Sequence, residues 1–255
     1  MNASPTKASE KVLVIVTGAK TMILQNGKEY STGYFLGELT EPLEALVEAG
    51  IDFDIATPGG IEPTMDKNGN RLFYWSYNTT ALHRGLEFAR GSEKMKRPLI
   101  LEKITENDLN QYAGVFVPGG HGPMVDLLNN TAVAMILQHF HVHQKPTALL
   151  CHAPAVLLNL KNDETSWPYA GYDMTVVSDL EERVAENFFL KGRVPFAYPE
   201  TALRQAGANV HTKTLIMKSQ VIQDRELITG QNPYAAREFG QVFAKAVKNK
   251  QVQNN

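Results

Sequence analysis

Cysteine is nearly absent from this chain of 255 residues, which contains only one, Cys151. A single cysteine cannot form a disulfide within the chain, so the sequence favours a reducing compartment, and we predict a cytoplasmic protein. Long hydrophobic runs are missing as well. The apolar segment 11–17 is too short to span a bilayer, and the polar residues before it lack the apolar stretch of a signal peptide. No membrane partner is therefore predicted.

An excess of charge of one sign is also missing, since 25 Lys and Arg are nearly balanced by 27 Asp and Glu. This balance provides no electrostatic attraction for a nucleic acid, and no nucleic-acid partner is predicted. The glycine turn 119–122 lacks the spacing of a dinucleotide site. What remains is an ordinary globular composition, 43% hydrophobic and 20% charged, which is sufficient for a sizeable core.

Short apolar segments alternate with segments of helical periodicity along most of the chain. The apolar segments are typical of parallel strands covered on both faces, because they lack polar alternation. We therefore predict an α/β fold with one open, mostly parallel sheet between two layers of helices. The expected strands are 12–17, 52–57, 114–118, 146–150 and 174–177, with short edge strands within 209–217, 220–223 and 226–229. The expected helices are 34–49, 124–143, 199–206 and 234–248.

One segment, residues 61–110, interrupts this alternation and is predicted to form a small inserted subdomain. It is too long for an ordinary connection and carries aromatic residues of its own, as a cover over an active site would. These aromatic residues are Phe73, Tyr74, Trp75 and Tyr77. Residues 11–248 are predicted to form a single domain, and residues 1–10 and 249–255 are predicted as tails.

The chemistry of the chain is predicted to centre on Cys151. An apolar run, 148–150, leads to Cys151 and His152, and Pro154 suits the first turn of a helix that follows. A strand, a sharp turn and a helix would present the thiol beside the helix N-terminus, where its pKa is expected to be lowered. The alternative is a buried, inert core cysteine.

A cysteine nucleophile needs a base, a group that orients the base, and N–H donors for a developing oxyanion. His152 is the adjacent base, and Gly120 lies in a glycine turn at the end of another strand. Three carboxylates, Asp179, Glu181 and Glu182, follow the next strand and could orient His152. The residues alone do not choose among them, and a solvent-exposed helix start is the alternative interpretation.

Titratable residues at two other places in the sequence are candidates for a functional site. Glu38 lies near the start of the predicted helix 34–49, and its local pattern is that of an exposed carboxylate favoured by the helix dipole. His139, His141 and His143 are two residues apart on a predicted helix, so they do not share one face. We predict no metal site and no cofactor.

Four motifs occur together in the order and at the spacing of one known superfamily. They are Thr32-Gly33-Tyr34-Phe35-Leu36-Gly37-Glu38, Val117-Pro118-Gly119-Gly120-His121-Gly122, Leu150-Cys151-His152-Ala153-Pro154 and Ile228-Thr229-Gly230-Gln231-Asn232-Pro233. The chain resembles the superfamily of the PfpI intracellular proteases and the Parkinsonism-associated deglycase, which is class I glutamine-amidotransferase-like. Its Thr-Gly-x-x-x-x-Glu opening resembles most closely the branch of heat-inducible chaperones and glutathione-independent glyoxalases (glyoxalase III). The resemblance covers residues 11–248, and the insertion 61–110 is its least typical part.

This resemblance implies a flavodoxin-like three-layer α/β/α sandwich, with Cys151 on a nucleophile elbow and Glu38 reaching the thiol. It also implies that the backbone N–H groups of Gly120 and His152 bind an oxyanion. The chain departs from many relatives at Ala153, where they have glycine.

The resemblance further implies a Cys–His–acid triad completed by Glu182, with Asp179 as the second choice. The implied activity is that of a cofactor-independent glyoxalase III (D-lactate dehydratase), which converts a small aldehyde, methylglyoxal, to lactate. In this interpretation Cys151 adds to the aldehyde, Glu38 moves a proton between the adjacent carbons, and His152 assists.

Two other functions are kept as alternatives. One is a stress-protective chaperone that binds unfolded proteins through the aromatic run 73–77. The other is a small cysteine peptidase or amidase that uses the same triad. Because relatives in this superfamily are commonly dimers, the resemblance also implies a homodimer.

Overall fold

A seven-stranded β-sheet forms the centre of the computed structural model, which describes residues 10–161, 166–215 and 218–254. The strand order is β10-β11-β7-β6-β1-β4-β5, and the neighbouring strands are parallel except β10 and β11. The strands are β1 (Lys11–Ile15), β4 (Asp52–Thr57), β5 (Leu99–Ile100), β6 (Gly114–Val117), β7 (Thr147–Leu150), β10 (Val221–Asp224) and β11 (Leu227–Gly230). The predicted mostly parallel sheet is confirmed.

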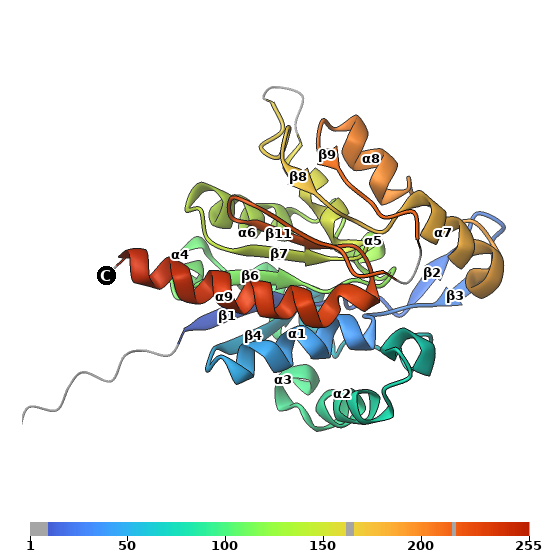
Figure 1. Ribbon diagram of the computed structural model, residues 1–255, viewed down its shortest axis with the longest axis horizontal. Helices are drawn as coiled ribbons and strands as arrows, with labels where there is room; N and C mark the ends of the chain where they lie inside the picture. Colours follow the sequence, from blue (N-terminus) through green and yellow to red (C-terminus); the bar gives the residue numbers. More distant parts are fainter. Residues whose placement is uncertain (1–9, 162–165, 216–217, 255) are drawn as a thin grey trace, which may run out of the picture.

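Helices cover both faces of this sheet (Figure 1). On one face α1 (Leu36–Glu48) packs against α9 (Ala236–Asn254). On the other face α6 (Thr131–Val142) packs against η4 (Ala153–Leu160). The flavodoxin-like α/β/α sandwich is therefore confirmed.

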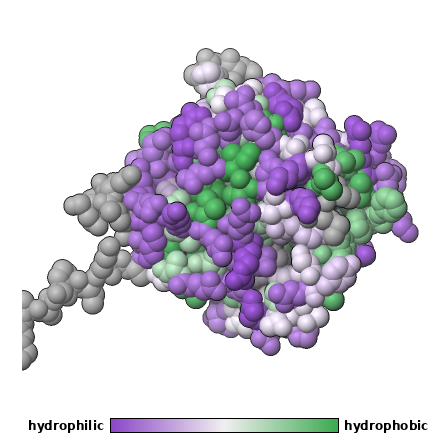
Figure 2. Space-filling view, viewed as in Figure 1, coloured by the Kyte–Doolittle hydropathy of each residue, from purple (hydrophilic) through white to green (hydrophobic). Residues whose placement is uncertain are grey.

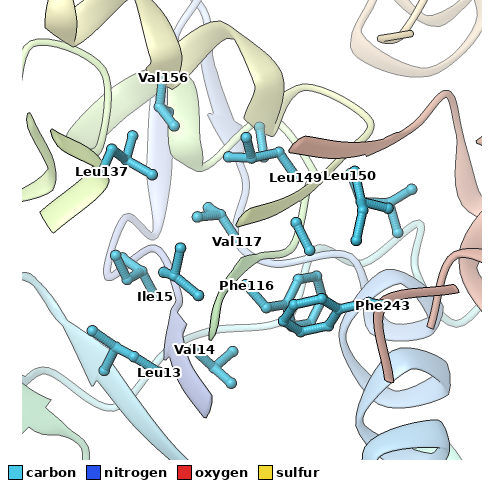
Figure 3. Close-up of a cluster of buried hydrophobic side chains, with 14 of the residues drawn as sticks. Leu13, Val14, Ile15, Phe116, Val117, Leu137, Leu149, Leu150, Val156 and Phe243 are labelled. Carbon is cyan, nitrogen blue, oxygen red and sulfur yellow. The ribbon is translucent and has the colours of Figure 1, made fainter. Parts of the chain in front are cut away.

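The central strands are buried on both faces because their side chains alternate between two hydrophobic layers. Figure 3 shows Phe243 of α9 next to Phe116 of β6, whereas Leu137 of α6 and Val156 of η4 lie across the strands. Every residue of β6 and β7 is buried. This double burial explains why these strands appear in the sequence as continuous apolar runs.

One predicted helix is divided in the structure. The segment 124–143 contains α5 (Pro123–Asp126) and then α6, because the Asn130 side chain accepts hydrogen bonds from the first N–H groups of α6 and starts a new helix there. Among the described helices, none has the length and apolar character that a membrane crossing requires.

The predicted tails are shorter than expected where the structure describes them. The helix α9 continues to the end of the described chain, so residues 249–254 are helical rather than a tail. Glu10, which falls in the other predicted tail, is buried, and its carboxylate pairs with Lys248 at 2.9 Å. Residues 1–9 lie outside the described part of the chain.

A β-hairpin lies between β1 and α1. Its strands, β2 (Thr21–Ile23) and β3 (Glu29–Ser31), have three residues each and are too short to show a periodic pattern. The hairpin packs against Leu190 of η5 (Glu186–Leu190), and together they form a second, smaller hydrophobic core.

The segments 174–177 and 209–215, in which strands are predicted, are largely irregular. Two short strands, β8 (Asp173–Met174) and β9 (Asn209–Val210), pair with each other outside the main sheet. The remaining residues of 174–177 are buried without pairing as a strand, so their apolar pattern reflects burial alone. Residues 216–217 lie outside the described part of the chain.

The insertion 61–110 folds back onto α1. It contains η2 (Leu72–Trp75), α2 (Thr79–Gly91), α3 (Glu93–Lys96), η3 (Leu101–Lys103) and α4 (Glu106–Leu109), and it supplies the edge strand β5. Figure 1 shows α2 beside α1, and the two helices are in contact. Trp75, Ala81 and Met95 from this insertion are buried in the principal core.

Candidate active site

Cys151 lies on a sharp turn between β7 and η4, as the sequence predicts. Its φ is +62°, in the left-handed region, which costs a residue other than glycine about 1–3 kcal/mol. Two backbone hydrogen bonds hold this conformation: the Cys151 N–H donates to the Gly230 carbonyl at 2.8 Å, and its carbonyl accepts from the Val177 N–H at 3.0 Å. The thiol is thereby fixed at the carboxyl end of the parallel strands, where ligands bind in such sheets.

A hydrogen-bonded chain links the thiol to a carboxylate. The Cys151 Sγ lies 3.2 Å from Nδ1 of His152, and Nε2 of His152 lies 2.6 Å from Oε2 of Glu182. All three side chains are buried. The helix α7 (Asp179–Ala185) positions Glu182 in its first turn, and Ser178 caps this helix. The arrangement is that of a Cys–His–acid triad.

The other two candidate carboxylates bond elsewhere. Asp179 accepts a hydrogen bond from the Thr201 hydroxyl at 2.6 Å. Glu181 completes the capping box of α7 and accepts from the side-chain amides of Gln231 and Asn232. Of the three carboxylates, Glu182 is the one that is hydrogen-bonded to His152.

His121 is a site residue to which the sequence assigned no role. Its Nε2 lies 2.9 Å from Oε1 of Glu182, and its ring centroid is 4.2 Å from that of His152. Two histidines therefore share the two oxygens of one carboxylate. One feature of the sequence could have indicated His121: it lies in the glycine turn that follows β6, and β6 is the neighbour of β7, the strand that leads to Cys151.

The two histidines have pKa values shifted in opposite directions. Burial lowers the pKa of His121, but the Glu182 carboxylate outweighs burial, so the pKa of this histidine is raised. Burial and the neighbouring His121 lower the pKa of His152. Although burial alone would raise the pKa of Glu182, the two histidines hold it far below its usual value. A protonated His121, an ionised Glu182 and a neutral His152 are thus favoured.

The same three residues could ligate a metal ion by geometry alone. One donor atom from each of His121, His152 and Glu182 lies within 4.8 Å of the others. Their Nε2 atoms are, however, already hydrogen-bonded to the two carboxylate oxygens, so a metal would have to displace both hydrogen bonds. His139, His141 and His143, which the sequence did not predict as a metal site, lie on α6 and at its end, outside this cluster.

Glu38 meets Cys151 in the interior of the protein. It lies in the first turn of α1 and is completely buried. A Cβ on Gly119 would collide with both Oε2 of Glu38 and Cβ of Cys151. The carboxyl group and the cysteine side chain therefore both lie directly next to this glycine. The exposed helix carboxylate suggested by the local pattern is wrong.

The electrostatics of this pair differ from the prediction. Burial raises the pKa of Glu38 to about 8. Burial and the adjacent Glu38 raise the pKa of the Cys151 thiol, and the Gly120 N–H opposes this rise in part. The lowered thiol pKa predicted from a helix N-terminus is therefore wrong, because burial of the thiol, together with the adjacent Glu38 carboxyl group, outweighs that effect. The resting pair holds its protons near neutral pH.

A cavity of about 290 Å³ contains the thiol, and most of its wall is aromatic or aliphatic. The insertion contributes Phe73 and Tyr74 of η2 to this wall. Later parts of the chain contribute Phe189 of η5 and Tyr234. The aromatic run 73–77 is thus not one exposed surface, since part of it faces this cavity. Phe73 and Tyr74 belong to the segment that the sequence suggests as a cover over an active site, whereas the sequence did not indicate Phe189 and Tyr234.

Comparisons with known proteins show the family and the fold of this chain. The model of the DJ-1/PfpI family matches residues 32–246. The protein/nucleic acid deglycase HchA of Pseudomonas aeruginosa is 31% identical over 251 residues, which are 96% of this chain and 83% of the relative. HchA of Staphylococcus aureus is 30% identical over 244 residues, 94% of this chain and 80% of the relative.

Two solved structures share the fold. The Rapid Encystment Protein 24 kDa of Francisella tularensis has a TM-score of 0.77 at 24% identity, covering 93% of this chain and 99% of that one. Glyoxalase III of Candida albicans has a TM-score of 0.75 at 21% identity, covering 93% and 97%. Because the family match includes the whole span from Glu38 to Glu182 and most of the chain, this protein belongs to the DJ-1/PfpI family.

Proposed function

We propose that the protein is a glutathione-independent glyoxalase, which converts a 2-oxoaldehyde such as methylglyoxal to the corresponding 2-hydroxy acid, in this case lactate. The observation that carries the proposal is the buried carboxyl of Glu38, whose pKa is raised to about 8, beside the Cys151 thiol. A carboxyl with that pKa can both accept and return a proton near neutral pH. The relatives named protein/nucleic acid deglycase and the structural neighbour named glyoxalase III support this choice.

The reaction begins when the Cys151 sulfur forms a bond to the aldehyde carbon. The thiol proton passes to Nδ1 of His152, 3.2 Å away, and then to the aldehyde oxygen, which gives a hemithioacetal. Glu182 accepts the hydrogen bond of Nε2, so that the neutral ring presents Nδ1 as the base. The N–H groups of Gly120 and His152 stabilise negative charge on the oxygen.

Glu38 then carries out the proton transfer between carbons. Its carboxylate removes the proton from the former aldehyde carbon and returns it to the neighbouring carbon through an enediol. The hydroxyl proton on the first carbon passes to the oxygen of the second carbon, so the first carbon becomes a thioester and the second an alcohol. The oxidation and the reduction thus occur within the substrate. Water cleaves the thioester and restores the thiol. One aldehyde and one water give one hydroxy acid, and the sequence of steps uses no cofactor.

The test is lactate formation from methylglyoxal without glutathione. We expect the wild type to convert methylglyoxal to lactate. In Cys151→Ala and in Glu38→Gln, kcat/KM should be lower by about 100-fold or more. Because Glu38 must be ionised to accept a proton, kcat/KM should rise with pH and level off above about 8. Glu48→Gln, an exposed carboxylate on the same helix, serves as the control. A wild type with a free thiol and no turnover would overturn the proposal.

A small peptidase or amidase is the second candidate, because the triad geometry also suits acyl transfer. The cavity volume of about 290 Å³ and its aromatic wall favour a small substrate over a peptide chain. Chaperone activity, a homodimer and a cytoplasmic location stay predictions from the sequence.

A further inference from the structure

The cavity of the site is larger than methylglyoxal requires. Methylglyoxal carries only a methyl group on its ketone, whereas five phenylalanine and tyrosine rings line this cavity of about 290 Å³. The ring centroids of Phe73 and Phe189 are 6.1 Å apart, those of Tyr74 and Phe189 are 6.3 Å apart, and those of Tyr74 and Tyr234 are 6.3 Å apart. A methyl group would contact a small part of this wall.

The aromatic wall is fixed by contacts outside the cavity. On the insertion, Trp75 follows Tyr74, is buried, and donates from Nε1 to the Gly69 carbonyl at 2.9 Å. The Tyr234 hydroxyl donates to the carbonyl of Phe73 at 3.3 Å, which joins the two sides of the wall. The cavity is therefore formed before a ligand enters, so binding requires little ordering of these side chains.

Phe189 is held in the same way on the other side. The next residue of η5, Leu190, is 1% exposed and packs into the small core beneath the hairpin. The guanidinium of Arg71 lies 5.3 Å from the ring centroid of Phe189. The orientation of Phe189 toward the cavity is thus set by its helix and by its neighbours.

We propose that the site is selective for 2-oxoaldehydes whose ketone carries an aromatic or similarly large apolar group, and that Phe189 is a specificity-determining residue. This inference rests on the proposed glyoxalase function. An aromatic group on the substrate would make edge-to-face or offset contacts with the rings of the wall while the aldehyde meets the Cys151 thiol. The chemistry is unchanged, since the ring lies on the far side of the carbon that Glu38 reprotonates.

The experiment compares phenylglyoxal with methylglyoxal by the initial rates at which mandelate and lactate appear. Formation of product is followed because phenylglyoxal also reacts with arginine side chains. Since one methylene in an apolar pocket changes kcat/KM by about 10-fold or more, we expect at least about a tenfold preference for phenylglyoxal.

The deciding quantity is the ratio of the two kcat/KM values in matched variants, because the intrinsic reactivities of the two aldehydes cancel. Phe189→Ala should lower the ratio by about tenfold or more. Phe188→Ala removes the same side chain from the adjacent position, which is 72% exposed, and should leave the ratio unchanged. Phe189→Leu removes the aromatic ring but keeps most of the side-chain volume, so it is less liable to misfold than Phe189→Ala. Thermal unfolding of each variant checks that it is folded.

Three results would overturn the inference. The first is a preference for methylglyoxal, and the second is a ratio of kcat/KM values that neither Phe189→Ala nor Phe189→Leu changes. Either result would contradict the proposed selectivity and would be compatible with the proposed glyoxalase function. Absence of turnover of both aldehydes by the wild type removes the proposed function, and the selectivity with it.

Discussion

At the scale of single residues, His121 controls the protonation of the neighbouring histidine. Its ring lies 4.2 Å from that of His152, and both rings bond to Glu182. A protonated His121 lowers the pKa of His152, in addition to the effect of burial. In the proposed mechanism the neutral form of His152 accepts the thiol proton, so His121 would act there as a positioning residue through its effect on the pKa of His152.

We predict that His121→Gln raises the pKa of His152, because the variant removes the positive charge beside it and leaves the Glu182 carboxylate in place. More of His152 is then protonated near neutral pH, and kcat/KM should fall there by about tenfold. NMR titration of the His152 ring measures the pKa, and a pH–rate profile measures the loss.

His83→Gln, a change at an exposed histidine on α2, is the matched control and should alter neither quantity. An unchanged or lowered pKa of His152 in His121→Gln would contradict the prediction, whatever the effect on rate.

Single residues of the site differ in how well the sequence predicted them. Cys151 and His152 could be found from the apolar runs around them, since a strand that ends in a nucleophile leaves a local pattern. Glu38 required the resemblance to a known superfamily, because its partner lies more than a hundred residues away in the chain. His121 and Phe189 were missed because their roles arise only from side chains that other elements bring to them.

At the scale of elements, the N-cap of α7 determines where the triad acid lies. Ser178 accepts a hydrogen bond from the Glu181 N–H, and the Glu181 side chain accepts from the Ser178 N–H, which completes a capping box. Glu182 is the next residue and projects from this first turn to His152.

We predict that Ser178→Ala lowers the free energy of unfolding by about 1 kcal/mol and also reduces kcat/KM, because the first turn of α7 is less firmly held. Asn130→Ala removes the N-cap of α6, which carries no triad residue, and should cost a similar free energy with no matching loss of activity. Chemical denaturation and glyoxalase kinetics on both variants give the comparison. Equal losses of activity would show that the cap acts on stability alone.

The elements that the sequence predicted well are the ones that are buried on both faces. The strands β1, β6 and β7 are almost entirely apolar in sequence because two helical layers cover them. The hairpin of β2 and β3 was missed because each of its three-residue strands buries one residue only. Segment 174–177 was predicted as a strand because burial gives it the same composition.

At the scale of the whole molecule, the buried Glu38 makes stability depend on pH. Its pKa is about 8 in the folded protein, against an ordinary value of 4.5. The unfolded chain releases this proton first as the pH rises, so the folded state loses stability progressively between pH 4.5 and about 8. Each unit of pKa difference corresponds to about 1.4 kcal/mol, so the full effect is of the order of a few kcal/mol.

We predict that Glu38→Gln is more stable than the wild type at pH 8, by several degrees in Tm, and that the difference disappears toward pH 5. The amide has the same shape and no charge to lose. Thermal unfolding across this pH range measures the difference, and Glu48→Gln on the exposed side of α1 should follow the wild type. A difference that is constant with pH would indicate a packing effect instead.

The position of β11 in the sheet has a consequence for how the protein is made. This strand is the last of the sheet in sequence but lies between β10 and β7, and its Gly230 carbonyl accepts the N–H of Cys151. The ribosome adds Cys151 before Gly230, so the strained turn lacks one of its two anchors until the last strand of the sheet has been synthesised. The nascent polypeptide therefore carries an unfixed thiol, and its reactive centre is assembled late, after almost all of the supporting sheet has emerged.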